Sequence, residues 1–196
     1  MGKVTAGFSM SVDGFVADAH DGVDEVFKWY FTGTTDREVS TGDTTFTMTA
    51  EGADLIEEGG RGAGVLVTAR RTFDLAKAWG GKHPMDVPIV VVTHSVPEEW
   101  ASRDGSPFTF VTGGVPDAIA TARQIAGDRD VVVGAPSVTK QCLQLGLLDE
   151  IHIDLTPVLL GGGIRLFDLL PAPIPMEVVE ASGNRHVTHI TYRLVR

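Results

Sequence analysis

Two consecutive arginines follow a short β-branched run and precede a segment with helical character. Arg70, Arg71 and Thr72 come two residues after the run Val65-Leu66-Val67. Backbone N–H groups at the start of a helix attract phosphate, and guanidinium groups pair with its oxygens. These three residues therefore predict an anion-binding site. The alternative is a solvated surface pair that binds nothing.

Two further strand ends carry phosphate-compatible chemistry. In open α/β sheets, ligands bind beyond the carboxyl ends of the strands. Three successive strand ends of this kind therefore predict one site for a phosphorylated ligand. Hydroxyl and imidazole groups follow the run at 89–92 in Thr93, His94 and Ser95. A strand-to-helix turn follows the run at 131–133 and comprises Gly134, Ala135, Pro136, Ser137, Val138 and Thr139.

Candidates for proton transfer and for substrate contact lie in the first 30 residues. Asp13 and Asp24 are the candidate acids. Asp13 precedes a glycine, a pairing that more often shapes a turn, so the structural role is favoured for it. Trp29 and Tyr30 are candidates to cover a flat substrate, and packing in the core is the alternative for both.

Metal centres and activated nucleophiles are not indicated. The six histidines show no ligand spacing, and no Gly-x-Ser-x-Gly elbow occurs. The single cysteine, Cys142, lies on the apolar face of an expected helix and is interpreted as a core residue. We expect no metal.

Composition indicates one domain over residues 1–196. The chain is 43% hydrophobic with a formal net charge of −10, so most of its surface repels nucleic acid. No run approaches the roughly 18 apolar residues that span a bilayer, and the first residues are too polar for a signal peptide. We expect a cytoplasmic protein with a small-molecule ligand and neither a nucleic-acid nor a membrane partner.

The apolar patterning predicts an α/β fold. Continuous β-branched runs at 65–67, 89–92 and 131–133, with a further strand at 108–111, are typical of parallel strands buried on both faces. Helices are predicted after Arg70, from Pro116 to Gly127, and over 137–145. Repeated strand–helix–strand order implies right-handed crossovers.

The last third of the chain predicts antiparallel strands. Residues 150–155 alternate, which indicates one buried and one wet face, and strands at 177–182 and 186–195 flank Gly183-Asn184, a tight-turn dipeptide. The expected sheet is mixed, mostly parallel, flanked by helices and closed by an antiparallel C-terminal hairpin. Residues 18–60 predict a long loop and then a helix over about 49–58.

Several motifs resemble the dihydrofolate-reductase-like superfamily, and most of all its branch containing the reductase domain of the bifunctional riboflavin-biosynthesis deaminase–reductase. The resemblance covers nearly the whole chain. It rests on the order and spacing of short motifs: the segments at 9–17, 69–74, 79–84, 91–94, 132–135, 148–151 and 157–163.

The resemblance implies NADPH as cofactor. It implies that Arg70, Arg71 and Thr72 hold phosphate groups and that Thr93, His94 and Ser95 lie by the adenosine and its 2′-phosphate. It further implies that 134–139 cradles the pyrophosphate and that 11–17 lines the nicotinamide, with Val16 and Ala17 nearest. This sequence departs from the family pattern in having Ala69 before the arginines and Ala135-Pro136 after Gly134. By resemblance, the Gly134–Ala135 peptide is expected to be cis.

The expected function is that of an NADPH-dependent reductase, which transfers a hydride to a pyrimidine- or pteridine-like heterocycle. A true dihydrofolate reductase is an alternative, as is an NADP(H)-binding or regulatory module without turnover. Related stand-alone domains commonly pair, so a homodimer is expected, with Ile190, Tyr192 and Leu194 sharing one strand face.

Overall fold

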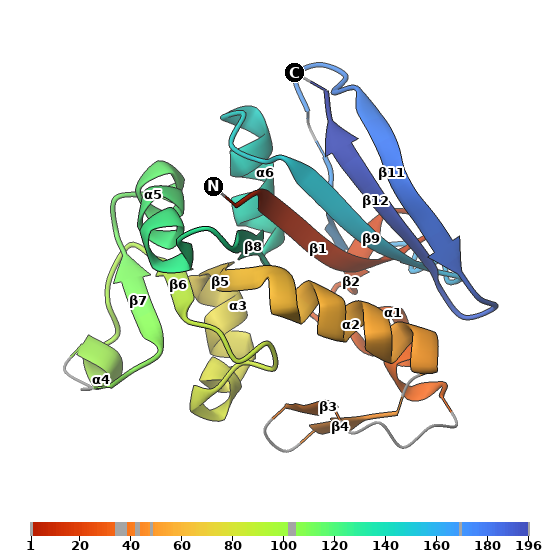
Figure 1. The fold of residues 1–196 in the computed structure, drawn as a ribbon, viewed down its shortest axis with the longest axis horizontal. Helices are drawn as coiled ribbons and strands as arrows, with labels where there is room; N and C mark the ends of the chain where they lie inside the picture. Colours follow the sequence, from red (N-terminus) through yellow and green to blue (C-terminus); the bar gives the residue numbers. More distant parts are fainter. Residues whose placement is uncertain are drawn as a thin grey trace.

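The computed structural model in Figure 1 describes residues 2–33, 39–41, 44–47, 49–101, 105–168 and 170–195. Its centre is an eight-stranded sheet with the order β11-β12-β9-β1-β8-β5-β6-β7. Six neighbouring strands run parallel to one another. They are β1 (Val4–Ser11), β5 (Ala63–Ala69), β6 (Ile89–Val92), β7 (Phe108–Val111), β8 (Asp130–Val133) and β9 (Glu150–Thr156).

Two antiparallel strands complete the sheet beyond β9. They are β12 (Thr188–Leu194), which pairs with β9, and β11 (Met176–Gly183), which forms the outer edge. The hairpin lies beside β9 at one end of the molecule (Figure 1). The expected fold class, a mixed and mostly parallel sheet with an antiparallel C-terminal hairpin, is therefore confirmed.

Short elements surround this sheet. Two small antiparallel pairs join β2 (Phe15–Ala17) to β10 (Ile164–Arg165), and β3 (Val39–Thr41) to β4 (Thr44–Phe46). The helices are α1 (Asp24–Phe27), η1 (Lys28–Phe31), α2 (Ala50–Gly62), α3 (Arg70–Leu75), η2 (Lys77–Gly81), α4 (Glu98–Ala101), α5 (Val115–Ala126) and α6 (Pro136–Gln144). Among the described helices, none is long and apolar enough to cross a membrane.

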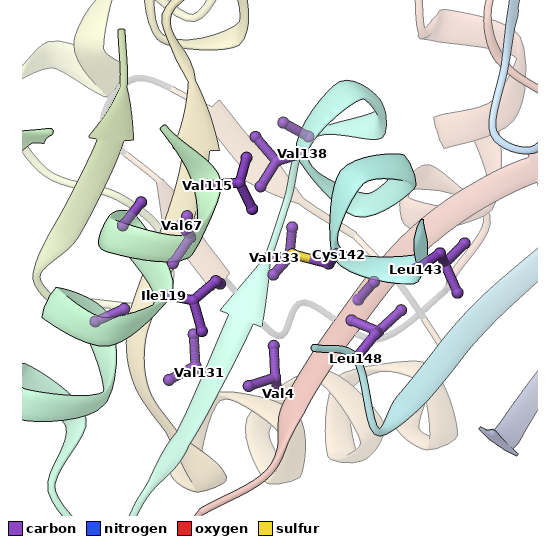
Figure 2. Close-up of a cluster of buried hydrophobic side chains, with 14 of the residues drawn as sticks. Val4, Val67, Val115, Ile119, Val131, Val133, Val138, Cys142, Leu143 and Leu148 are labelled. Carbon is purple, nitrogen blue, oxygen red and sulfur yellow. The ribbon is translucent and has the colours of Figure 1, made fainter. Parts of the chain in front are cut away.

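Helices α5 and α6 cover one face of the sheet. Their buried side chains meet those of β1, β5 and β8 in the main hydrophobic cluster, of which Figure 2 shows Val4, Val67, Ile119, Val133 and Cys142. Gly114, with φ of 90°, precedes α5, and Gly127, with φ of 64°, ends it. Glycine takes this conformation without steric cost, so the helix begins and ends where the sequence places these residues.

A second cluster covers the opposite face of β5, β6 and β7. Leu66, Ile89 and Val91 are buried there against Phe73 of α3. The Phe73 ring meets that of Phe108 edge to face, with centroids 5.0 Å apart. This cluster places α3, and the arginines at its start, on the second face of the sheet.

The two faces of strand β1 differ, because one carries apolar side chains and the other carries polar side chains. Val4 and Ala6 belong to the α5–α6 cluster, and Phe8 and Met10 pack against it. Because side chains alternate along a strand, Ser9 and Ser11 point to the second face, where both are buried. The second face beside β1 is therefore polar, which is unusual for the middle strand of a sheet.

Three expectations about the elements are wrong in detail. The C-terminal turn is a four-residue loop at 184–187, closed by the Asn184 N–H on the Val187 carbonyl at 2.9 Å, and not a tight Gly183-Asn184 turn. The predicted wet face of 150–155 includes Glu150, which is buried because β1 and β12 flank it and Lys3 and Arg193 neutralise it. The predicted 18–60 loop contains α1, η1, β3 and β4, and its helix continues to Gly62.

Candidate functional site

The carboxyl ends of the parallel strands bring the three predicted anion-binding segments to one edge. Ala69, at the end of β5, pairs with Val92 at the end of β6, and Val67 pairs with Val133 at the end of β8. Arg70, Thr93 and Gly134, which follow these residues, therefore start from neighbouring positions. The turn after Ser11 lies at the same edge because β1 runs parallel to β8.

Arg70 connects two of these segments. Its Nε lies 2.8 Å from both carboxylate oxygens of Asp74, one turn along α3, and its Nη1 donates to the Ser95 carbonyl at 3.4 Å. Arg71 instead pairs with Asp21, with 2.5 Å between Nη2 and Oδ2. This ion pair raises the pKa of Arg71, which stays charged. Both arginines are available at the edge, but each already has an acidic neighbour.

The segment after β6 is a compact turn held by its own side chain. The Thr93 hydroxyl donates to the Ser95 carbonyl at 2.8 Å and accepts from the Ser95 N–H at 3.3 Å. Thr93 itself is buried, whereas the side chains of His94 and Ser95 are exposed. Thr93 therefore shapes the turn that presents His94 and Ser95 to a ligand.

The segment after β8 places its side chains in two environments. Ala135, Val138 and Thr139 are buried, and the Thr139 hydroxyl donates to the Ala135 carbonyl at 3.0 Å. Ser137 is exposed in the first turn of α6. Ala135 occupies the N-cap and no side-chain hydrogen bond caps this helix among the described residues. Backbone N–H groups of the first turn are therefore what this segment offers to an anion.

The expected cis bond between Gly134 and Ala135 is wrong, since no peptide bond of the described residues is cis. Ala135 is extended, with φ of −141° and ψ of 127°, the conformation that a following proline favours. Pro136 can then open the helix after an ordinary trans bond. A trans bond is about 2.5–4 kcal/mol lower in free energy than a cis bond that does not precede proline.

The donor set of this edge suits the phosphates of a dinucleotide. Two guanidinium groups, an imidazole, two exposed hydroxyls and an uncapped helix start converge from α3, the 93–95 turn and α6. Gly134 packs closely here, since a Cβ at this position would approach Cδ1 of Leu66 to 3.0 Å and that side chain would have to give way. Thr72, in the first turn of α3, is partly buried, and Val16 and Ala17 have buried side chains in β2.

Asp13 is held as a carboxylate acceptor. The Ser11 hydroxyl donates to its Oδ1 at 2.6 Å, and the N–H groups of Leu160 and Gly161 donate to its two oxygens at 3.1 and 2.7 Å. These bonds, with Ser11 foremost, lower the pKa of Asp13 to about 2. An acid of this strength is ionised at neutral pH, so the geometry favours the structural alternative for Asp13.

The other candidate acid and the two aromatic residues separate in space. Asp24 is exposed in the first turn of α1. Trp29 is buried, donates from Nε1 to the Ser9 hydroxyl at 2.9 Å and stacks on Tyr30 with ring centroids 4.0 Å apart. Burial raises the pKa of Tyr30, and the charge of Asp154 adds to this effect. The aromatic pair therefore covers the polar second face of β1.

A histidine–aspartate pair beneath this aromatic cover was not predicted from the sequence. Asp154 of β9 pairs in register with Ser9 of β1 on one side and with His189 of β12 on the other. The three side chains therefore form a row across three adjacent strands. The sequence showed polar residues at alternate positions of β9 and β12. It gave no information on the strand register that brings these residues together. Among the described residues, no group of three potential ligands could hold a metal ion.

Comparison with known proteins gives a family and a fold. The family model described as the RibD C-terminal domain matches residues 2–182. No curated protein sequence matches the chain.

Several solved structures share the fold. A protein from Shewanella sp. PV-4 named for riboflavin biosynthesis is 24% identical, with 99% of each chain covered and a TM-score of 0.73. A Thermotoga maritima diaminohydroxyphosphoribosylaminopyrimidine deaminase/5-amino-6-(5-phosphoribosylamino)uracil reductase is 12% identical, with a TM-score of 0.63 over 99% of this chain and 57% of that longer chain. Enterococcus faecalis dihydrofolate reductase, complexed with NADP(H) and RAB-propyl, is 14% identical, with a TM-score of 0.59 over 100% and 98% of the two chains.

Proposed function

Because the chain belongs to the RibD C-terminal domain family, a family of dihydrofolate-reductase-like reductases, we propose that it is an NADPH-dependent reductase of a small pyrimidine-like heterocycle. The observation that carries this proposal is the convergence of three phosphate-compatible segments at the carboxyl edge of the sheet. Arg70 supports it further by joining two of these segments through the Ser95 carbonyl.

The chain's own groups would hold the cofactor at this edge. Arg70, Arg71 and Ser95 would bind the 2′-phosphate, and the backbone of the first turn of α6 would bind the pyrophosphate. Arg71 would exchange its contact with Asp21 for a contact with phosphate, which its largely exposed side chain allows. When bound, NADPH supplies the hydride of the reduction.

The other end of the cofactor would lie by the turn between β1 and β2. Asp13 fixes this turn against residues 160 and 161, and the Val12 N–H donates to the Val158 carbonyl at 2.9 Å. Val12 and Leu159 are exposed on the two joined segments. They give the edge an apolar rim, which would contact a flat ring and exclude water from it.

The substrate would bind on the second face of the sheet, beside Ser9 and the stacked Trp29 and Tyr30. Aromatic residues above a polar strand face suit a flat ring with polar edges. A pyrimidine is favoured over a folate because the family matched here is that of the RibD C-terminal domain, and because the Thermotoga relative is named as a reductase of 5-amino-6-(5-phosphoribosylamino)uracil.

Turnover of NADPH tests this function. Purified protein is mixed with NADPH and either 5-amino-6-(5-phosphoribosylamino)uracil or 7,8-dihydrofolate, and NADPH absorbance is followed with time. We expect the pyrimidine to be reduced faster than dihydrofolate, with a product heavier by two hydrogens in mass spectrometry. NADPH binding without turnover of either compound would instead support a non-catalytic module. That alternative has one observation in its favour, since Asp13 is held ionised and is a poor proton donor.

A further inference from the structure

Asp154 and His189 form a closely held pair on the second face of the sheet. Nδ1 of His189 lies 2.6 Å from Oδ1 of Asp154. A carboxylate only accepts, so the imidazole donates its Nδ1 proton in this bond. The bond fixes the orientation of the ring and leaves Nε2 as the nitrogen that can exchange a proton with a ligand.

The second ring nitrogen, Nε2, is unpartnered within the part of the chain that the structure describes. Nε2 of His189 is buried and has no hydrogen-bond partner among the residues that the structure describes. The side chain as a whole is 12% exposed. A buried polar atom without a partner costs free energy, and a catalytic role is one of the reasons for which a fold retains such an atom.

The pair borders both the aromatic cover and an open part of the same strand face. The ring of Trp29 meets that of His189 edge to face at 5.2 Å. On the other side, the next row in register consists of Gly7, His152 and Thr191. A methyl group placed on Gly7 would meet no atom of the described residues within 4 Å, and the His152 side chain is exposed. The strand face is therefore open one row away from the pair, on the side where His152 lies.

We propose that His189 is the proton donor of the reduction and that Asp154 is its positioning residue. This inference rests on the proposed function. In the reduction of a C=N or C=O bond, the carbon takes a hydride from a reduced nicotinamide and the π electron pair moves to the heteroatom. The heteroatom then takes the Nε2 proton of the His189 imidazolium. The neutral imidazole that remains is reprotonated from solvent.

The charges around the ring suit this role. Among the described residues, the titratable groups near the ring are Asp154 of β9, Tyr30 of η1, which stacks on the Trp29 ring that meets His189, and, one row away, His152 of β9. Asp154 is the one anion among them, because burial and Asp154 itself raise the pKa of Tyr30 and keep the phenol neutral. Its carboxylate accepts the Nδ1–H hydrogen bond and so holds the ring in one orientation. Asp13, held as an ionised acceptor, does not compete for the role.

Variant kinetics test the role of the ring. The variants are His189→Gln and Asp154→Asn, and the control is His186→Gln, a partly buried position in the loop of the same hairpin. With 5-amino-6-(5-phosphoribosylamino)uracil and NADPH, we expect His189→Gln to lower kcat at least about 100-fold, as loss of a general acid does. We expect Asp154→Asn to lower it less, because the ring remains and only its fixed orientation is lost. We expect the control to match wild type.

A second measurement is independent of turnover. In protein labelled with 15N-histidine, the His189 signals are assigned by their loss in His189→Gln. Saturating NADPH and then millimolar 6-aminouracil are added as probes. We expect the pyrimidine probe to shift the Nε2 signal of His189 and to leave His186 unchanged. We also expect the Nδ1 proton signal to be lost in Asp154→Asn.

The two proposals fail in different ways. If NADPH does not bind to wild type, the proposed function fails and kinetics cannot test His189. In that case the NMR experiment still tests the inference, which an unshifted Nε2 signal with the pyrimidine probe overturns. If wild type reduces the pyrimidine and His189→Gln does so at the same rate with the same pH profile, the reductase stands and the proton-donor role is overturned. If Nε2 stays unshifted in the presence of NADPH and probe, the role is likewise overturned.

Discussion

The main-chain N–H of Gly161 donates to Oδ2 of Asp13 at 2.7 Å, across 148 positions of sequence. This bond joins the turn after β1 to the glycine-rich segment after β9. Both segments lie at the carboxyl edge, so the carboxylate holds together the part of the site where the nicotinamide would bind. The clamp depends on the negative charge of the Asp13 carboxylate. It should therefore weaken when this group is protonated or replaced by the neutral amide of asparagine.

Acid should release the Asp13 clamp. The pKa of Asp13 is lowered from 3.8 to about 2 in the folded protein, so the ionised form favours folding. Its contribution is present above 3.8 and is lost as pH falls through about 2. We expect Asp13→Asn to lower Tm at neutral pH and to flatten the fall of Tm in this acid range. Asp24→Asn, at an exposed position, is the control, and an identical acid response of wild type and Asp13→Asn would contradict the clamp.

Protonation of His83 should destabilise the protein at a higher pH than protonation of Asp13 does. Burial lowers its pKa from 6.5 to about 4, and its Nδ1 accepts a hydrogen bond from the Met85 N–H at 3.1 Å. The unfolded state binds the proton more readily, so stability is full above 6.5 and falls as pH drops toward 4. The loss amounts to about 3–4 kcal/mol at most. Urea unfolding across this range should show it in wild type and much less of it in His83→Gln.

The arginines at the start of α3 should select NADPH over NADH. A charge-assisted bond to phosphate contributes about 1.5–3 kcal/mol, so Arg70→Ala or Arg71→Ala should weaken NADPH binding roughly tenfold or more and leave NADH binding nearly unchanged. Fluorescence titration measures both affinities. Lys82→Ala removes an exposed charge that pairs with Asp86 away from the edge and serves as control. Equal affinities for the two cofactors in wild type and in both arginine variants would contradict this selection.

The homodimer expected from the sequence stays a prediction. We now expect its contact surface on the edge strand β11 and not on the face of β12 that carries Tyr192 and Leu194. Tyr192 and Leu194 pack against the main cluster, whereas Met176, Val178 and Val179 are exposed on the edge strand β11. An exposed edge strand of this length favours pairing with another chain. Light scattering should give twice 20.9 kDa for wild type and the monomer mass for Val178→Lys. A monomer at micromolar wild-type concentration would rule the dimer out.

The sequence predicted the core strands well because their signal is local. The runs at 65–67, 89–92, 108–111 and 131–133 all lie in parallel strands, since continuous β-branched residues are favoured where both faces of a sheet are covered. Gly127 marked the end of α5 for a similar reason, because its positive φ suits glycine. The three anion-binding segments followed from these strands, as each lies directly after one.

The parts that failed depend on distant partners. Glu150 is buried because Lys3 and Arg193 meet it from neighbouring strands, and alternation along β9 carries no information about them. Asp154 and His189 are 35 positions apart and meet only through the register of β9 and β12. The pairing of Arg71 with Asp21 is of the same kind. Spacing along the chain could not have found any of these contacts.

A crystal structure of the protein soaked with NADPH tests the central claim most directly. The account predicts density for the cofactor across the carboxyl ends of β1, β5, β6 and β8. The 2′-phosphate should lie by Arg70, Arg71 and Ser95, and the nicotinamide by the turn after Ser11. A saturating soak that leaves this edge empty, or that places the nucleotide elsewhere on the protein, would contradict it.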